Sequence, residues 1–157
     1  MESASSSSNA GILLGSLYGT VNDSYVTGTV TGTTAVSGLG SAHTTVGCYA
    51  SATVTASSGV GAGLNAAGGN DGVVIDSFAS STVHAPSGSA YDLTNPVNSA
   101  AQVMNSFFDS TKCSGCTNVD ATGETTSYFY SATNAPLKNW DFDKVWMAQS
   151  SAFPTLR

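Results

Sequence analysis

The chain has 157 residues, enough for one domain with a sizeable core, and its formal net charge at pH 7 is −6. Only 9% of the residues are charged, against about 25% in ordinary soluble domains. The four basic residues are too few to neutralise a phosphate backbone, which argues against nucleic-acid binding.

Residues 1–9 are predicted to be a linker or a vector-derived remnant, because residues 5–8 are all serine. The first residues lack the basic and apolar regions of a signal peptide, so the targeting signal of a secreted protein would lie further upstream. No apolar stretch is long enough to span a membrane. Disorder is the competing interpretation of such a Ser-, Gly- and Thr-rich chain, but a hydrophobic share of 41% and regularly spaced aromatic residues favour a folded domain.

From residue 10 to residue 110 the chain is built from repeats. Aromatic residues mark the repeat at separations of 24, 29 and 29 residues: Tyr25, Tyr49, Phe78 and Phe107. A turn-prone residue stands two positions before each of them: Asp23, Gly47, Asp76 and Asn105. A β-branched residue stands four positions before each: Val21, Thr45, Val74 and Val103. A valine follows the first three aromatic residues after five positions: Val30, Val54 and Val83.

Each repeat unit predicts two or three short strands separated by turns, and such a unit cannot bury its own apolar side. Stacking successive units places valine on valine and aromatic on aromatic in one continuous core. The sequence therefore predicts an all-β fold, a β-solenoid of about four coils over residues 10–110. A β-sandwich is the competing fold, but it has no reason to repeat a composite unit of 24–29 residues.

The motifs inside the units resemble the GLUG repeat. Residues 11–15 read Gly-Ile-Leu-Leu-Gly, residues 19–25 read Gly-Thr-Val-Asn-Asp-Ser-Tyr, and residues 27–30 read Thr-Gly-Thr-Val, in the order of that family's pattern. Residues 72–78 repeat the middle motif, whereas the second unit lacks it and the unit from residue 89 lacks the Gly/Leu opening. Residues 140–146 and 153–157 resemble the segment that closes such arrays. The resemblance implies a β-solenoid region of large secreted or surface-attached bacterial proteins, adhesin-like proteins among them.

Hydroxyl residues occupy the same place in three successive units and are the candidate binding residues: Thr27, Thr29, Ser51, Thr53, Ser80 and Thr82. On a flat solenoid face they would form an exposed ladder of the kind that matches the ice lattice. The same hydroxyl groups can instead form hydrogen bonds along the stack and stabilise strands.

Residues 111–157 are predicted to form a C-terminal aromatic cap, since an open solenoid end exposes unpaired strand edges. This segment contains both tryptophans, Trp140 and Trp146. Exposed Trp rings would instead form a sugar-binding platform, although large aromatic residues near a chain end usually belong to a core.

The cysteines are predicted to have structural roles. Cys113 and Cys116 are expected to form a local disulfide in an oxidising compartment. Cys48 stands where other units have serine, which explains it as a small residue, while an intermolecular bridge is left open.

No catalytic or metal centre is predicted, and no cofactor. His43 and His84 do not form the H-E-x-x-H motif of metallopeptidases, and no G-x-S-x-G elbow occurs. The carboxylate pairs are interpreted as turn or surface acids: Asp71 with Asp76, and Asp141 with Asp143. Calcium at residues 70–71 and Asp76 is a minor alternative.

These observations lead to the prediction of a non-catalytic, extracellular module on the bacterial surface that presents a binding surface for structural or adhesive purposes. Surface glycans or proteins of a host or a neighbouring cell are the expected partners. The alternatives are a glycan- or ice-binding domain and a subunit that self-associates through its solenoid ends into a filament.

Overall fold

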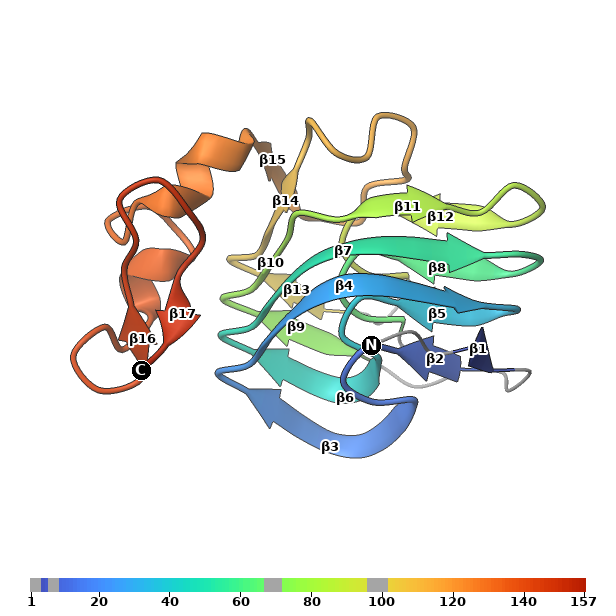
Figure 1. Cartoon of the computed structure of the whole chain (residues 1–157), viewed down its shortest axis with the longest axis horizontal. Helices are drawn as coiled ribbons and strands as arrows, with labels where there is room; N and C mark the ends of the chain where they lie inside the picture. The colour runs from blue at the N-terminus through green and yellow to red at the C-terminus, as the bar shows by residue number, and fades with distance from the viewer. Residues whose placement is uncertain (1–3, 6–8, 67–71, 96–101) are drawn as a thin grey trace.

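The computed structural model describes residues 4–5, 9–66, 72–95 and 102–157 (Figure 1). The strands are β1 (Ala4–Ser5), β2 (Asn9–Gly11), β3 (Ser16–Asn22), β4 (Tyr25–Gly32), β5 (Ala35–Ser37), β6 (Ser41–Val46), β7 (Tyr49–Ala56), β8 (Val60–Ala62), β9 (Val73–Ile75), β10 (Phe78–Ala79), β11 (Thr82–His84), β12 (Ser89–Tyr91), β13 (Gln102–Met104), β14 (Phe107–Asp109), β15 (Thr122–Glu124), β16 (Trp146–Met147) and β17 (Thr155–Leu156). The short 3-10 helices are η1 (Thr126–Tyr130) and η2 (Leu137–Asn139).

The strands up to β15 form three parallel sheets, and each full turn of the chain adds strands to all three. Sheet A has the order β1-β4-β7-β10-β14-β15, with β11 also paired to β7. Sheet B has the order β12-β8-β5-β2, and sheet C has the order β13-β9-β6-β3. A chain that winds through the same three sheets on every turn is a β-solenoid, and this prediction is confirmed (Figure 1).

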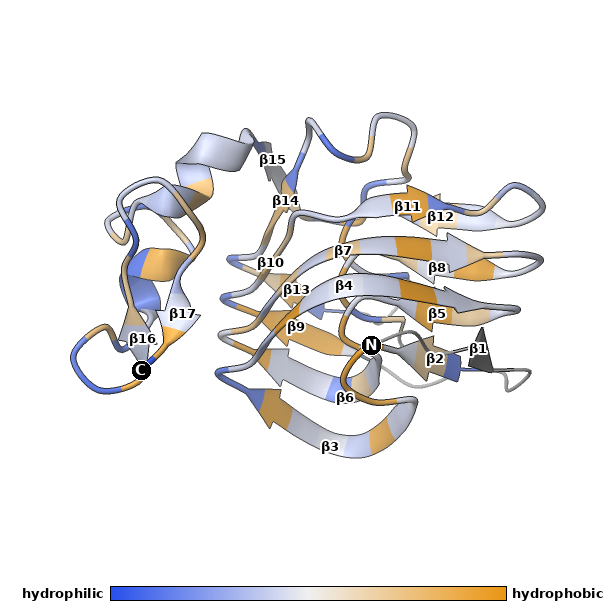
Figure 2. Cartoon of the chain, viewed as in Figure 1, coloured by the Kyte–Doolittle hydropathy of each residue, from blue (hydrophilic) through white to orange (hydrophobic). Residues whose placement is uncertain are grey.

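The register of the sheets follows the sequence repeat. All four aromatic positions pair in sheet A, in the order Tyr25↔Tyr49↔Phe78↔Phe107. The valines pair as Val30↔Val54↔Val83. Apolar bands accordingly line up across β4, β7 and β11 (Figure 2). The predicted alignment of the units is therefore the alignment of the coils.

A sharp turn precedes each aromatic residue, which explains why a turn-prone residue stands two positions before it in every unit. All four residues of this column have positive φ: Asp23 (43°), Gly47 (60°), Asp76 (47°) and Asn105 (44°). Gly, Asn and Asp tolerate this left-handed conformation best. These four residues therefore form the sharp corner between sheet C and sheet A in every coil.

The stack contains about three full turns, fewer than the four predicted. The full turns are β3-β4-β5, β6-β7-β8 and β9-β10-β11-β12. In the next turn β13 and β14 form, but the chain leaves sheet A after Asp109 and enters a loop that the disulfide closes. The fourth unit is thus incomplete because its second half forms this loop and adds no full set of strands to the stack.

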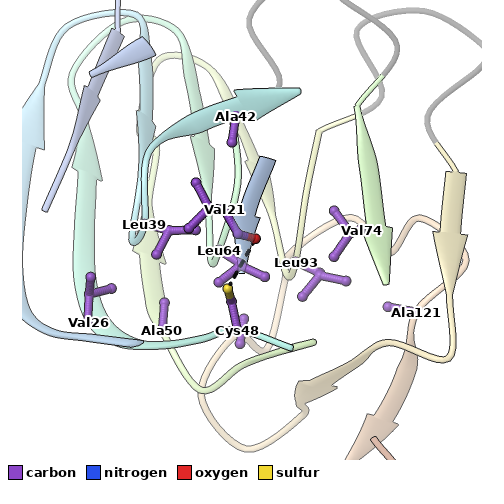
Figure 3. Close-up of a cluster of buried hydrophobic side chains, with 11 residues drawn as sticks. Val21, Val26, Leu39, Ala42, Cys48, Ala50, Leu64, Val74, Leu93 and Ala121 are labelled. Carbon is purple, nitrogen blue, oxygen red and sulfur yellow. Dashed lines mark hydrogen bonds between the residues drawn. The ribbon is translucent and has the colours of Figure 1, made fainter. Parts of the chain in front are cut away.

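The interior is filled by columns of apolar side chains (Figure 3). Leu39, Leu64 and Leu93 are fully buried and joined by backbone bonds from the Leu39 amide to the Leu64 carbonyl and from the Leu64 amide to the Leu93 carbonyl. Burying one such side chain contributes about 1.5–3 kcal/mol. Leu93 extends the leucine column into the unit that lacks the Gly/Leu opening.

The C-terminal segment packs along one flank of the solenoid, beside the corner that carries the aromatic residues (Figure 1). Trp146 contacts Tyr25 and Tyr49 from coils one and two, with ring centroids 6.1 and 6.0 Å apart. Phe129 of η1 stacks on Phe78 at 4.4 Å. The aromatic segment therefore covers a flank of the stack, where it ties successive coils together, and not the open end for which the cap was predicted.

Candidate functional site

The outward side of sheet A carries hydroxyl groups at alternate positions. On β4 the outward residues are Thr27, Thr29 and Thr31, all exposed, while Val26 and Val30 point inward and are buried. This alternation is the ordinary consequence of strand geometry. β4 therefore exposes a row of three threonines on its outer side, while the valines on its inner side pack into the core.

The neighbouring strand repeats this row. β7 presents Ser51, Thr53 and Thr55, of which Thr53 is exposed and the other two are half-buried. Its inward residues Ala52, Val54 and Ala56 are buried. The strands β4 and β7 therefore share one pattern, in which outward hydroxyl residues alternate with inward small or apolar residues.

The rows are in register and form columns. The pairs are Thr27↔Ser51, Thr29↔Thr53↔Thr82 and Thr31↔Thr55↔His84. The spacing is about 4.8 Å between coils and roughly 6.6 Å between alternate residues along a strand. We call Thr27, Thr29, Thr31, Ser51, Thr53, Thr55 and Thr82 the hydroxyl face. It carries no Asp, Glu, Lys or Arg side chain among the outward positions of β4 and β7.

Five members of this face are predictable from the repeat, whereas two others, Thr31 and Thr55, were not predicted. Both stand two residues beyond a threonine that was found, so the period of two along a strand is the signal that would have identified them.

Ser80 does not belong to the hydroxyl face. It is 4% exposed, and its Oγ donates to Asp109 Oδ2 at 2.7 Å. The strand pairing is interrupted between β10 and β11, at Ser80 and Ser81, so the simple alternation of outward residues is lost there. This correction shortens the predicted ladder in the third coil.

Asp109 itself lies at the centre of a hydrogen-bond cluster. Its carboxylate accepts hydrogen bonds from the Thr111 amide and hydroxyl, from Ser80 and from the Thr126 hydroxyl at 2.5 Å. Burial raises the pKa of this carboxyl, but the hydrogen bonds outweigh burial, so the pKa of Asp109 lies below its usual range. A carboxylate held in this way is a structural anion that joins the last coil to η1.

The tryptophans do not form a sugar-binding platform. Trp140 is 7% exposed and Trp146 is fully buried. The Trp140 indole donates to the Asp76 carbonyl at 2.7 Å, and the Trp146 indole donates to Asp23 Oδ1 at 3.3 Å. Buried rings whose N–H groups bind the corner residues are core residues.

The cysteines behave as structural residues. Cys113 and Cys116 form the predicted disulfide, with Cα atoms 5.4 Å apart. Cys48 is fully buried, and its thiol donates to the Val21 carbonyl (Figure 3). The thiol also lies within hydrogen-bond distance of the Val46 carbonyl. Burial raises the pKa of Cys48 to about 12, which makes the thiol unreactive. A buried, protonated thiol is not available for an intermolecular bridge.

The carboxylates form no metal-binding group among the described residues, which show no cluster of three or more His, Cys, Asp or Glu side chains. Asp76 accepts hydrogen bonds from Asn105 and Asn139. Asp141 accepts from the Asp143 and Lys144 amides and so closes a turn. Residues 70 and 71, part of the calcium alternative, lie outside the described residues.

No helix in the described part of the chain is long and apolar enough to cross a membrane. In comparisons with known proteins, no family model, no curated protein and no solved structure matches the chain.

Proposed function

We propose that this chain is a non-catalytic, extracellular module that adheres, through its hydroxyl face, to a regular and uncharged hydroxylated surface such as a packed cell-surface polysaccharide. The observation that carries the proposal is the register of the face: two rows of hydroxyl side chains repeat along β4 and β7 with their columns aligned. A grid of this kind complements a ligand that itself repeats in two directions.

The rigidity of the face supports the proposal. Its inward neighbours Val30 and Val54 are fully buried, and β4 and β7 are paired along the whole length of both strands. Threonine side chains are also stiff, since branching at Cβ restricts χ1. Binding therefore requires little ordering of the protein, and preorganisation of this kind favours affinity for weak, repeated contacts.

The location outside the cell rests on two further observations. The repeat motifs resemble the GLUG repeat of secreted and surface-attached proteins, and Cys113 and Cys116 form a disulfide. Disulfides persist mainly in oxidising compartments. Both observations support a location outside the cell, where an adhesive module would act.

Co-sedimentation with insoluble neutral polysaccharides, for example cellulose and chitin, tests the proposal. Thr53 lies in the middle column, so Thr53→Lys places a bulky charge inside the contact area. Thr20→Lys introduces the same change at an exposed position of β3 in sheet C and is the matched control. We expect wild type and Thr20→Lys to sediment with a polysaccharide and Thr53→Lys to stay in solution. Equal retention of both variants, or no retention of the wild type on any polysaccharide, would contradict the proposal.

Ice is the second candidate ligand, and the same registered columns favour it, because ice also presents a regular lattice of hydroxyl-like oxygen atoms. The buried positions of Trp140 and Trp146 remove the feature that would have favoured glycan stacking over ice. An ice-recrystallisation assay with the same three proteins separates the two ligands. Ice binding requires slower crystal growth with wild type and Thr20→Lys but not with Thr53→Lys; unchanged growth with all three excludes it.

A further inference from the structure

A groove of about 330 Å³ lies beside the hydroxyl face, between β11 and the disulfide loop. Its floor is formed by Thr82, Val83 and His84, and its wall by Lys112 and the residues from Cys113 to Cys116. All of these residues are described by the structure. The groove is separate from the surface to which the proposed adhesive function was assigned, apart from the shared Thr82.

The groove exists because one strand of the stack is missing. β10 is covered by β14, but no described strand pairs with the edge of β11 that faces away from β7. The chain leaves sheet A after Asp109, just before the positions at which a continued strand would cover β11. The floor of the groove is therefore an open strand edge, which is a template for adding another strand.

The valine column shows that the missing strand leaves an apolar surface uncovered. Val30 and Val54 are both 0% exposed, whereas Val83, the next member of the column, is only partly buried. A residue placed on Val83 by an added strand would complete this column, as Val54 does for Val30.

The wall of the groove is held in place by the protein itself. The Thr117 amide donates to the Ala90 carbonyl at 2.8 Å, and the Lys112 amide donates to the Asp109 carbonyl at 3.1 Å. The disulfide closes the loop between these two bonds. The groove is thus formed before a ligand enters.

The charge in the groove selects the kind of ligand. Lys112 is one of four Lys and Arg residues in a chain of net charge −6, and its exposed side chain lines the groove together with exposed His84. No acidic side chain lines the groove. An anionic side chain of the ligand would complement the charge of Lys112 at this part of the groove.

We propose that the groove binds an extended peptide segment of a partner protein by strand addition to β11, with a small apolar residue on Val83 and an acidic residue directly after it, beside His84 and Lys112. The order follows from a parallel strand in register with β11, the direction of all neighbouring strands in sheet A. Backbone bonds supply affinity in this mode, and the two side chains supply selectivity.

The test uses the full chain and the fluorescent peptide acetyl-Gly-Ser-Val-Asp-Gly-amide, with its Lys-for-Asp analogue as the charge-reversed probe. Gly115→Trp is the blocking variant, because a Cβ at Gly115 meets no atom within 4 Å and so leaves the fold intact. Lys112→Glu reverses the charge at the groove, and Lys138→Glu makes the same change at an exposed position on η2.

Fluorescence polarisation is expected to show binding of the Asp peptide to wild type and Lys138→Glu. The affinity should fall about tenfold or more in Lys112→Glu and Gly115→Trp, and for the Lys peptide on wild type. Amide NMR shifts on binding should centre on Val83 and His84. The proposal is overturned if neither peptide binds wild type, if both peptides bind alike, or if Lys112→Glu and Lys138→Glu bind alike.

Discussion

Asp109 is the buried residue at which the last coil meets the C-terminal segment. Because folding lowers its pKa, its carboxylate stabilises the fold above the unfolded pKa of about 4, and this stabilisation is lost as the pH falls through the lower folded value. We predict that Asp109→Asn lowers the free energy of unfolding at neutral pH by about 1–3 kcal/mol, measured by urea denaturation. The loss should shrink in acid, and a variant as stable as wild type at neutral pH would refute the structural role.

Asp92 has the opposite dependence on pH. It is 2% exposed, and burial raises its pKa to about 6 despite the hydrogen bond from the Leu93 amide. Its Oδ2 atom has no hydrogen-bond partner among the described residues. Folding therefore favours the protonated carboxyl, and stability falls as the pH rises from about 4 through about 6.

For Asp92→Asn we predict an unfolding free energy about 1–3 kcal/mol above that of wild type near pH 8, because the variant removes the buried charge and keeps the acceptor for the Leu93 amide. Near pH 3.5 the two proteins should be equally stable, since wild-type Asp92 is then protonated. Denaturation curves across this range check the prediction. A stability difference that does not vary with pH would show that charge is not the cause.

At the scale of the elements, an aromatic cluster joins the C-terminal segment to the coils. We call this cluster, which is built around Tyr49, Phe78 and Trp146, the aromatic flank. Trp146 is fully buried against Tyr25, Tyr49 and Trp140. We predict that Trp146→Ala costs about 3–5 kcal/mol, as truncation of a large core side chain does. Tyr18→Ala, at a residue that is 83% exposed, should change the stability by less than about 0.5 kcal/mol. Chemical denaturation of both variants tests this, and equal stabilities would contradict the packing.

The sequence repeat predicted the strands and their register because equivalent positions carry equivalent side chains. Val30, Val54 and Val83 could be aligned by counting, and the structure pairs them. Alignment of the units does not identify equivalent residues where a unit lacks the repeat motif. Leu93 continues the leucine column without the glycines that mark Leu39 and Leu64, so it was not recognised.

The remaining features depend on contacts between distant segments, which a repeat pattern does not contain. Ser80 is removed from the hydroxyl face by Asp109, 29 residues away. The position of Trp146 follows from its contacts with Tyr25 and Tyr49 near the start of the chain. The groove results from the place where the chain leaves sheet A. The hydroxyl face was predictable in outline for the opposite reason, since it follows from strand alternation and coil register alone.

At the scale of the whole molecule, self-association through the solenoid ends is a further expectation. At one end β3 pairs only with β6 among the described strands, and the nearby side chains of Leu13, Leu17 and Tyr18 are 52%, 41% and 83% exposed. At the other end the disulfide loop partly covers the last coil, where Thr117 bridges to Tyr91. A filament needs both ends to be complementary.

We therefore predict monomers or closed dimers, because the disulfide loop leaves only short edges of the described strands open at this end, such as the three-residue edge of β11, which are too short for a repeating head-to-tail contact. Size-exclusion chromatography with light scattering over a concentration series checks this. Should dimers form, Tyr18→Lys should dissociate them while Thr53→Lys leaves them unchanged. Rods that lengthen with concentration in negative-stain images would refute the prediction.

The hydroxyl face, the groove and the aromatic flank all depend on one claim, that the coils stack with the register of the sequence repeat. Solution NMR with labelled methyl groups tests this claim most directly. The register places neighbouring methyl groups about 4.8 Å apart along the stack, so nuclear Overhauser contacts should join Thr29 to Thr53, Thr53 to Thr82, and Val54 to both Val30 and Val83. A slip of one residue would exchange the two faces of the sheet. Contacts from Thr53 to Val30 and Val83, in place of those to Thr29 and Thr82, would contradict the account.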